Sequence, residues 1–274
     1  MFELKGKTVL ITGGGGGIGG GMAHAFAERG ANIVLADINV SYAQEEAAKL
    51  PDGTVVQTVS LDVASLDSWM KASEHVLARF GTVDVLCNNA GVSTGFMPLV
   101  DVPPELFERV MAVNVTGVFN GIKTFAPSMI ARRRGYIVNT SSMNGLNPFG
   151  SFAAYSGSKF AVLGMSDALR EELAPFGVGV STLFPGLTRS RMSQNDAGKA
   201  AEVDPARLAA IQANMMDPVW LGRAVVHAVE HGEPYIVTHP GYRATLAERH
   251  DRIMAAFGEP AQPGYSVSGS ATLR

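Results

Sequence analysis

Short apolar segments alternate with longer helix-like segments along most of this 274-residue chain, and this alternation limits the possible folds more than any other feature. The strand candidates occupy residues 8–12, 31–37, 54–63, 83–91, 136–142, 178–186 and 233–239. The helix candidates lie between them, at residues 21–30, 41–50, 65–81, 103–135 and 153–177. Strands that are apolar throughout have to be buried on both faces. The pattern therefore predicts an α/β fold whose parallel sheet is covered by helices on both sides.

The composition is that of a globular protein, with 46% hydrophobic and 17% charged residues. A formal net charge of −3 argues against nucleic acid as a partner. Cys87 is the single cysteine, which excludes an intrachain disulfide and a thiolate metal site, and we expect it to be a buried strand thiol. No apolar run reaches the ~18 residues of a membrane span. We expect one cytoplasmic domain over residues 1–274, with a C-terminal extension over about 241–274.

Glycine accounts for eight of the nine residues from Gly13 to Gly21. A flexible linker would also be rich in glycine, but this run follows a strand candidate and opens a helix candidate. The N-terminus of a helix presents N–H groups to an anion, and glycine lets the backbone approach the ligand closely. The pattern G-x-G-x-x-G fits the run in several registers, whereas the more informative T-G-x-x-x-G-x-G begins at Thr12 and ends at Gly19. The run predicts a phosphate-binding turn.

Asp37 ends the second strand candidate, 18 residues after Gly19. A carboxylate there can accept hydrogen bonds from both ribose hydroxyls of NAD, and it would repel the 2′-phosphate of NADP. No Lys or Arg lies in the glycine turn or directly after Asp37 to neutralise that phosphate. The alternative is a surface carboxylate that caps a loop. The position favours NAD (NADH) as the cofactor.

The T-G-x-x-x-G-x-G pattern leaves five glycines unexplained, namely Gly14, Gly15, Gly16, Gly20 and Gly21. Gly20 and Gly21 fall in the first turn of the helix candidate, where each costs up to about 1 kcal/mol relative to alanine. We therefore expect the turn to be mobile until NAD orders it.

Tyr155 and Lys159 are four residues apart in a helix candidate, and this spacing places them on one helix face. A free phenol has a pKa near 10, too high for an efficient base at neutral pH, and a neighbouring ammonium group lowers it. Ser142 ends a strand candidate 13 residues before Tyr155, at the sheet edge where ligands bind in α/β proteins. A packed tyrosine beside a surface lysine would show the same spacing, so the pair is informative only together with Ser142.

Asn114 lies inside a helix candidate, where asparagine is a poor helix former. A buried amide needs hydrogen-bond partners, and we expect a functional water network to supply them.

These motifs together resemble those of the short-chain dehydrogenase/reductase family over about residues 5–240. The matching elements are TGGGGGIG, Asp37, NNAG, Asn114, the set of Ser142, Tyr155 and Lys159, and PGLT, in the family's order. The resemblance implies a doubly wound Rossmann fold with about seven parallel strands. It also implies an NAD-dependent enzyme, with a small-molecule alcohol or ketone as substrate, that forms a homo-tetramer or homo-dimer.

The resemblance implies roles for single residues. Tyr155 would exchange a proton with the substrate oxygen, Ser142 would hydrogen-bond that oxygen, and Lys159 would hold the nicotinamide ribose and assist the tyrosine. Asn114 would anchor a water in a proton relay. The implied cofactor-binding residues are Gly13, Gly16, Gly17, Ile18, Gly19, Asp37, Ile38, Asp62, Val63, Asn89, Ala90, Gly91, Tyr155, Lys159, Pro185, Gly186 and Thr188. Among these, residues 62–63 would contact adenine, 89–91 the adenosine-side ribose, and 185–188 the nicotinamide amide.

The loops expected near the substrate are rich in apolar side chains, which predicts a hydrophobic or aryl substrate. The substrate candidates are Ser142, Met143, Asn144, Phe149, Phe152 and Met192, with a substrate loop over about 189–216. Ordinary core packing is the alternative for each apolar member. Asn144 and Arg191 could orient a polar substituent. The segment after residue 232 loosely resembles bacterial dehydrogenases that oxidise benzylic alcohols in lignin-derived aryl ethers.

The expected reaction is interconversion of a secondary alcohol and a ketone by hydride transfer with NAD. Three alternatives stay open: an NADPH-type 3-ketoacyl reductase, a sugar or polyol dehydrogenase, and a non-catalytic protein that senses NAD. His227 and His231 have a spacing that can bind metal, but no third ligand is evident, so we expect no metal site.

Overall fold

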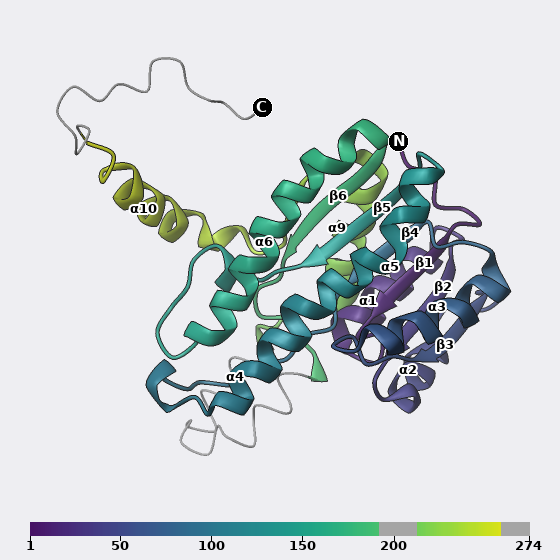
Figure 1. Ribbon diagram of the computed structural model, residues 1–274, viewed down its shortest axis with the longest axis horizontal. Helices are drawn as coiled ribbons and strands as arrows, with labels where there is room; N and C mark the ends of the chain where they lie inside the picture. Colours follow the sequence, from purple (N-terminus) through teal and green to yellow (C-terminus); the bar gives the residue numbers. More distant parts are fainter. Residues whose placement is uncertain (192–212, 259–274) are drawn as a thin grey trace. The chain divides into compact units, whose positions relative to one another are not determined.

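Residues 1–191 and 213–258 are described by a computed structural model of the chain (Figure 1). The chain divides into two compact units, Met1–His239 and Pro240–Arg274. The second unit contains the 3₁₀ turn η6, Pro240–Tyr242, and helix α10, Arg243–Met254. The first unit contains the sheet. The substrate loop expected over about 189–216 is described only at its two ends, and Met192 lies outside the described residues.

The seven strands of the first unit form one parallel sheet in the order β3-β2-β1-β4-β5-β6-β7. Their bounds are β1 Thr8–Thr12, β2 Asn32–Asp37, β3 Val56–Ser60, β4 Val85–Asn88, β5 Gly135–Thr140, β6 Val178–Phe184 and β7 Tyr235–Val237. The chain builds outward from β1 to β3, then crosses over and builds from β4 to β7, so the order reverses between β1 and β4. In doubly wound sheets, ligands bind at the carboxyl ends of the strands beside this reversal. The predicted doubly wound α/β fold is confirmed.

Helices cover both faces of the sheet. Their bounds are α1 Gly17–Ala27, α2 Val40–Ala47, α3 Leu66–Phe80, α4 Pro104–Met111, α5 Gly117–Ala131, α6 Ala153–Leu173 and α9 Pro218–His231, with 3₁₀ turns η1 Leu99–Asp101, η3 Met143–Gly145 and η4 Ala174–Phe176. One buried cluster joins the sheet to α1 and α9, and the other joins it to α3, α5 and the end of α6. Ser65 caps α3 through a hydrogen bond from the Ser68 N–H, and Gly81 ends that helix in the left-handed conformation, as the sequence predicts.

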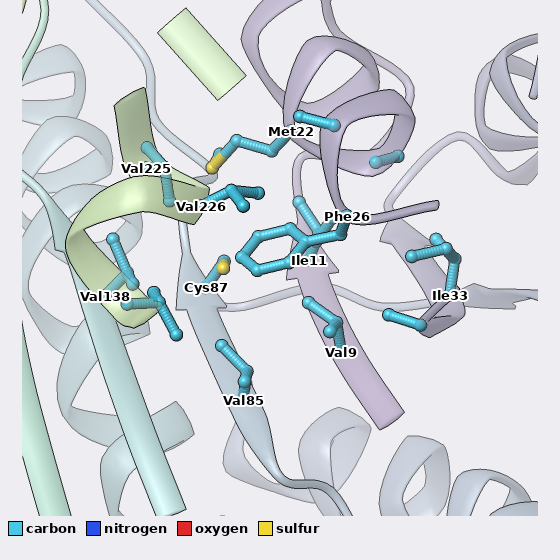
Figure 2. Close-up of a cluster of buried hydrophobic side chains, with 14 of the residues drawn as sticks. Val9, Ile11, Met22, Phe26, Ile33, Val85, Cys87, Val138, Val225 and Val226 are labelled. Carbon is cyan, nitrogen blue, oxygen red and sulfur yellow. The ribbon is translucent and has the colours of Figure 1, made fainter. Parts of the chain in front are cut away.

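Alternate residues of each strand point to opposite faces, and this periodicity fills the two layers of the core. Val9 and Ile11 of β1 lie in the cluster with Met22 and Phe26 of α1 (Figure 2), whereas Leu10 belongs to the cluster on the opposite face. All five side chains are fully buried. The apolar strands therefore pack as the sequence predicts.

Cys87 of β4 lies in the cluster shown in Figure 2 and is fully buried. Burial raises the pKa of its thiol, so the unreactive protonated form is favoured. The expectation of a buried strand thiol is confirmed.

The helical stretch expected over residues 103–135 is present from Pro104 to Ala131, but it is not one continuous α-helix. Helices α4 and α5 are separated by a π-helical turn, η2, Ala112–Thr116. Asn114 is at the centre of this turn and is fully buried. A π-turn widens the helix and is common at functional sites, which fits the presence of a poor helix former at this position.

The glycines beyond the T-G-x-x-x-G-x-G pattern serve close packing of the helices. A methyl group on Gly21 would lie 2.1 Å from the carbonyl oxygen of Pro218, and one on Gly222 would lie 2.2 Å from the carbonyl oxygen of Gly21. Helices α1 and α9 thus cross with their backbones in contact. A methyl group on Gly15 would likewise lie 2.4 Å from Cβ of Tyr42 on α2. The cost of these glycines is offset by packing, while the expected mobility of the turn stays a prediction.

Candidate active site

The carboxyl ends of the central strands are joined by hydrogen bonds to Thr12, the last residue of β1. Its Oγ1 accepts hydrogen bonds from the N–H groups of Asn89 at 2.9 Å and Ala90 at 3.0 Å. The Asn89 side chain donates to the Thr12 carbonyl oxygen at 3.0 Å. The NNAG loop after β4 is therefore fixed beside the glycine turn after β1, on the two sides of the strand-order reversal.

The glycine turn has the features of an anion site. Gly13 has φ +64°, and a methyl group on it would lie 2.9 Å from Cα of Ala90. Gly16 is the N-cap residue of α1, which has no side-chain cap and no acidic residue in its first turn. No acidic side chain of the helix's own first turn therefore offsets the positive end of its dipole. These features fit the phosphates of a dinucleotide.

Asp37 contacts the same turn from the end of β2. Its Oδ2 accepts a hydrogen bond from the Gly15 N–H at 3.0 Å, and its Oδ1 accepts one from the Asn39 N–H at 2.9 Å. The side chain therefore fixes the glycine turn and caps a loop. Each carboxylate oxygen can accept more than one hydrogen bond, so these contacts leave acceptor capacity for ribose hydroxyls. The next residue, Ile38, is 72% exposed.

A basic side chain from a distant segment also reaches this turn. The Arg191 Nε donates to the Gly15 carbonyl oxygen at 2.7 Å, and its guanidinium lies 4.1 Å from the centre of the Tyr42 ring. It also forms an ion pair with Glu45. We expected Arg191 to orient the substrate, but its side chain binds the glycine turn and α2. Sequence proximity to Asp37 could not reveal this arginine.

The loop after β3 carries the two residues expected to contact adenine. Val63 is buried, and its carbonyl oxygen accepts hydrogen bonds from Trp69 Nε1 and Asn120 Nδ2, both at 3.0 Å. Asp62 is partly buried, and its Oδ1 accepts a hydrogen bond from the Ala64 N–H at 3.0 Å. The two positions are thus held rigidly at the carboxyl edge of the sheet.

Tyr155 and Lys159 lie on successive turns of α6. Tyr155 is partly buried, whereas Lys159 is 3% exposed. The Lys159 Nζ lies 5.6 Å from the centre of the Tyr155 ring and donates to the Thr140 carbonyl oxygen, at the end of β5, at 2.9 Å. Burial lowers the pKa of Lys159 to about 8, because the charged form is poorly solvated there. The interpretation of a packed tyrosine beside a surface lysine is wrong.

Asn114 connects the π-turn to α6 and to the loop after β4. Its Oδ1 accepts a hydrogen bond from the Val92 N–H at 2.8 Å, and its Nδ2 donates to the Val92 carbonyl oxygen at 2.9 Å and to Ser158 Oγ at 3.0 Å. The Ser158 hydroxyl donates to the Tyr155 carbonyl oxygen at 2.6 Å. Protein groups therefore satisfy the amide that we expected water to satisfy.

Ser142 follows β5 in extended backbone and is 7% exposed. Its Oγ accepts a hydrogen bond from the Asn144 N–H at 3.1 Å. The next residue, Met143, is buried, and its N–H donates to the Pro185 carbonyl oxygen at 3.0 Å. The loop that carries Ser142 is thereby joined to the loop after β6, residues 185–188, in which Thr188 is 6% exposed.

An aromatic cluster leads to Tyr155 from two loops. Phe152 lies edge-on to Phe96 at 4.5 Å and to Tyr155 at 6.1 Å, and Phe149 lies 5.0 Å from Phe152, measured between ring centres. Phe96 is 76% exposed and Phe149 is 52% exposed. Large aromatic surfaces beside a candidate catalytic tyrosine can contact an apolar or aryl ligand.

Sequence reasoning missed four contributors to this site. They are Thr12 and Ser158, both inside motifs that were recognised, Phe96 in the loop after NNAG, and His239 after β7. Thr12 and Ser158 could have been found from the sequence, because both lie inside motifs that were recognised. Phe96 lies in an apolar loop that directly follows NNAG, which was a signal, whereas His239 had none, because only the fold brings its segment to the site.

The sequence from residue 7 to residue 201 matches the family model described as short chain dehydrogenase. The chain belongs to this family. Family membership agrees with the sheet order and the motif positions described above, and it establishes the chain as an enzyme of the dehydrogenase/reductase type.

Named relatives are similar to this protein over most of the chain. C alpha-dehydrogenase of Sphingobium sp. (strain NBRC 103272 / SYK-6) is 30% identical over 266 residues, which cover 93% of this chain and 87% of that protein. The 2,5-dichloro-2,5-cyclohexadiene-1,4-diol dehydrogenase of Sphingobium indicum is 36% identical over 203 residues, covering 72% and 80%. A short-chain dehydrogenase/reductase from Burkholderia phymatum, solved in complex with NAD, superposes with TM-score 0.84 at 31% identity, covering 97% and 100%.

Among residues 1–191 and 213–258, every helix is too short or too polar to cross a membrane. The same residues contain no group of three or more His, Cys, Asp or Glu side chains arranged to hold a metal ion. His227 and His231 stack on each other with ring centres 4.1 Å apart.

Proposed function

We propose that this protein is an NAD(H)-dependent dehydrogenase that interconverts a hydrophobic secondary alcohol and its ketone. The observation that carries the proposal is the buried amine of Lys159, one helical turn from Tyr155 and anchored to the end of β5. A lysine that is 3% exposed, and whose amine donates to a carbonyl oxygen rather than to a carboxylate among the described residues, is energetically costly. A role in acid–base chemistry explains why it is kept.

The chain's own residues handle the proton. Tyr155 exchanges a proton with the substrate oxygen, and Ser142 hydrogen-bonds the same oxygen. The ammonium form of Lys159 favours the phenolate and so lowers the pKa at which the phenol works as a base. Asn114 holds Val92 and Ser158 and thereby fixes the backbone of Tyr155. A nicotinamide bound beside these residues supplies the hydride transfer.

The cofactor of this proposal is NAD, held by the glycine turn, Asp37 and residues 62–63, 89–91 and 185–188. Asp37 supports NAD over NADP, and the NAD complex of the Burkholderia phymatum relative agrees with it. Arg191 is the basic group that the sequence interpretation lacked, but its guanidinium is paired with Glu45. We expect the KM for NAD to be at least tenfold below that for NADP. A lower KM for NADP would refute this choice of cofactor.

The substrate class follows from the aromatic cluster of Phe96, Phe149 and Phe152. These rings supply apolar contact area and few hydrogen-bond donors, which favours an aryl or cyclic alcohol over a polyol. The diol dehydrogenase of Sphingobium indicum, whose name gives a cyclohexadiene diol as its substrate, is consistent with a ring-bearing alcohol. A panel of benzylic, cyclic, aliphatic and polyol substrates assayed with NAD tests this class, and turnover restricted to polyols would refute it.

The proposed mechanism is tested with Tyr155→Phe. The variant keeps the ring and its contact with Phe152 but lacks the hydroxyl, so kcat should fall by at least about 10³-fold, within the range of a lost general acid–base group. Binding of NADH, followed by its fluorescence, should change less than threefold. Turnover near the wild-type rate would refute the assignment of Tyr155.

A further inference from the structure

His239 lies directly after β7 and binds the loop after β6. Its Nδ1 accepts a hydrogen bond from the Gly186 N–H at 3.0 Å, and its Nε2 lies 3.2 Å from the Leu187 carbonyl oxygen. The Thr238 hydroxyl lies 2.9 Å from the same Nδ1. One imidazole thus contacts a backbone N–H and a backbone carbonyl of adjacent residues in a loop about 50 residues earlier in the chain.

The partners of His239 define its tautomer. A backbone N–H can only donate and a carbonyl oxygen can only accept, so Nδ1 must be the acceptor and Nε2–H the donor. A doubly protonated ring would turn Nδ1 into a second donor facing the Gly186 N–H. The contacting groups are a peptide N–H, a carbonyl and a hydroxyl, none of which titrates. The charged residues on the adjoining segments, Arg189 and Asp217, form an ion pair with each other.

The ring also packs against the loop. A methyl group on Gly186 would lie 2.5 Å from Cγ of His239, so glycine at this position lets the ring approach the backbone. The Leu187 carbonyl oxygen accepts a second hydrogen bond, from the Met216 N–H at 3.0 Å, and the Pro185 carbonyl oxygen accepts one from the Met143 N–H at 3.0 Å. Three segments therefore hold the loop: Met143 and Met216 through backbone N–H groups, and His239 through its side chain.

We propose that His239, in its neutral Nε2–H tautomer, is a positioning residue that fixes residues 185–188 for binding the nicotinamide end of the cofactor. This inference rests on the proposed function, which assigns that loop to the nicotinamide. In this proposal His239 acts without direct contact to the cofactor or substrate. It acts by orienting the peptide groups of Gly186 and Leu187, which lead into Thr188.

The proposal is tested with two variants of full-length protein that separate bulk from hydrogen bonding. His239→Leu replaces the imidazole with an apolar side chain of similar size, which leaves the Gly186 N–H without its acceptor. His239→Asn places an amide oxygen near the position of Nδ1 and so retains an acceptor. His75→Leu, at an exposed position on α3, is the control for loss of a histidine.

We expect His239→Leu to raise the KM for NAD about tenfold while kcat falls less than threefold. His239→Asn should recover most of the lost affinity, and His75→Leu should match the wild type. Thermal unfolding separates this role from a structural one, because simple destabilisation would lower Tm and the active fraction without changing KM. The ¹⁵N shifts of the His239 ring, which report its tautomer, should show an unprotonated Nδ1 in the unliganded protein.

The outcomes separate this inference from the function on which it rests. If the wild type neither binds NADH nor oxidises any alcohol, the proposed function fails. If the wild type is active and His239→Leu leaves the KM for NAD within twofold, the role of His239 is refuted alone. The role of His239 is also refuted if His239→Leu and His239→Asn raise the KM for NAD equally, or if Nδ1 is protonated.

Discussion

Burial of the Lys159 amine makes a prediction about stability that is independent of any substrate. The amine is 3% exposed, and burial lowers its pKa from 10.5 to about 8. The unfolded chain therefore binds more protons than the folded chain between these pH values. By linkage, the free energy of unfolding rises as pH rises through this window. At neutral pH, the fold carries the full cost of holding a buried ammonium group.

The size of this cost follows from the two pKa values. At 1.36 kcal/mol per pKa unit, the difference destabilises the fold by about 3 kcal/mol at pH 7 and by about 1 kcal/mol at pH 10. Lys159→Met removes the charge and keeps most of the side-chain length. It also removes the hydrogen bond to the Thr140 carbonyl oxygen, which costs about 1–2 kcal/mol. We therefore expect the variant to be more stable than the wild type by about 1–2 kcal/mol at pH 7, and no more stable at pH 10.

Urea unfolding of both proteins at several pH values between 7 and 10 measures this difference. Titrations common to the two proteins cancel when their unfolding free energies are subtracted. Lys123→Met, at an exposed position on α5, is the matched control and should give a difference that does not change with pH. A Lys159→Met difference that is constant from pH 7 to pH 10 would refute the reasoning. The variant should also lose turnover, so that greater stability and lower activity appear together.

Two further predictions concern packing at α1 and at the aromatic cluster. Gly21→Ala should lower the free energy of unfolding by about 1–3 kcal/mol, because its methyl group meets the Pro218 backbone. Gly164→Ala, in α6 with open space around it, should raise the free energy of unfolding by up to about 1 kcal/mol. The packing argument is contradicted if urea unfolding finds Gly21→Ala more stable than Gly164→Ala. Phe96→Ala should lower kcat/KM for benzylic alcohols about threefold to tenfold, as expected for a lost aromatic contact. For aliphatic alcohols, kcat/KM should fall less than about twofold. Equal losses for both substrate classes in steady-state assays would count against an aryl site.

The sequence predicted the local parts of the site well because they depend on short-range patterns. The spacing of Tyr155 and Lys159 fixes a shared helix face, and the apolar strands fix which residues end at the carboxyl edge. Asn114 was singled out correctly as an anomaly in a helix. Its partners were not predicted, because the π-turn and the contacts with Val92 and Ser158 join three separate segments.

Contacts between residues far apart in the chain could not be predicted from the sequence. Arg191 reaches the glycine turn from 176 residues away, so a search for basic residues near Asp37 does not find it. The surplus glycines looked like a source of mobility when only α1 was considered. They have a packing reason once α9 and α2 lie against that helix.

The sequence by itself determined the order of strands and helices, the parallel sheet and the motif set of the short-chain dehydrogenase family. These features follow from hydrophobic periodicity and from residue types at short spacing, which act within one element and its neighbours. Only the tertiary structure decided that Lys159 is buried, that Gly21 is required by α9, and that His239 holds the loop after β6. Burial and backbone contact arise between segments that the chain brings together only on folding, and no local pattern records them.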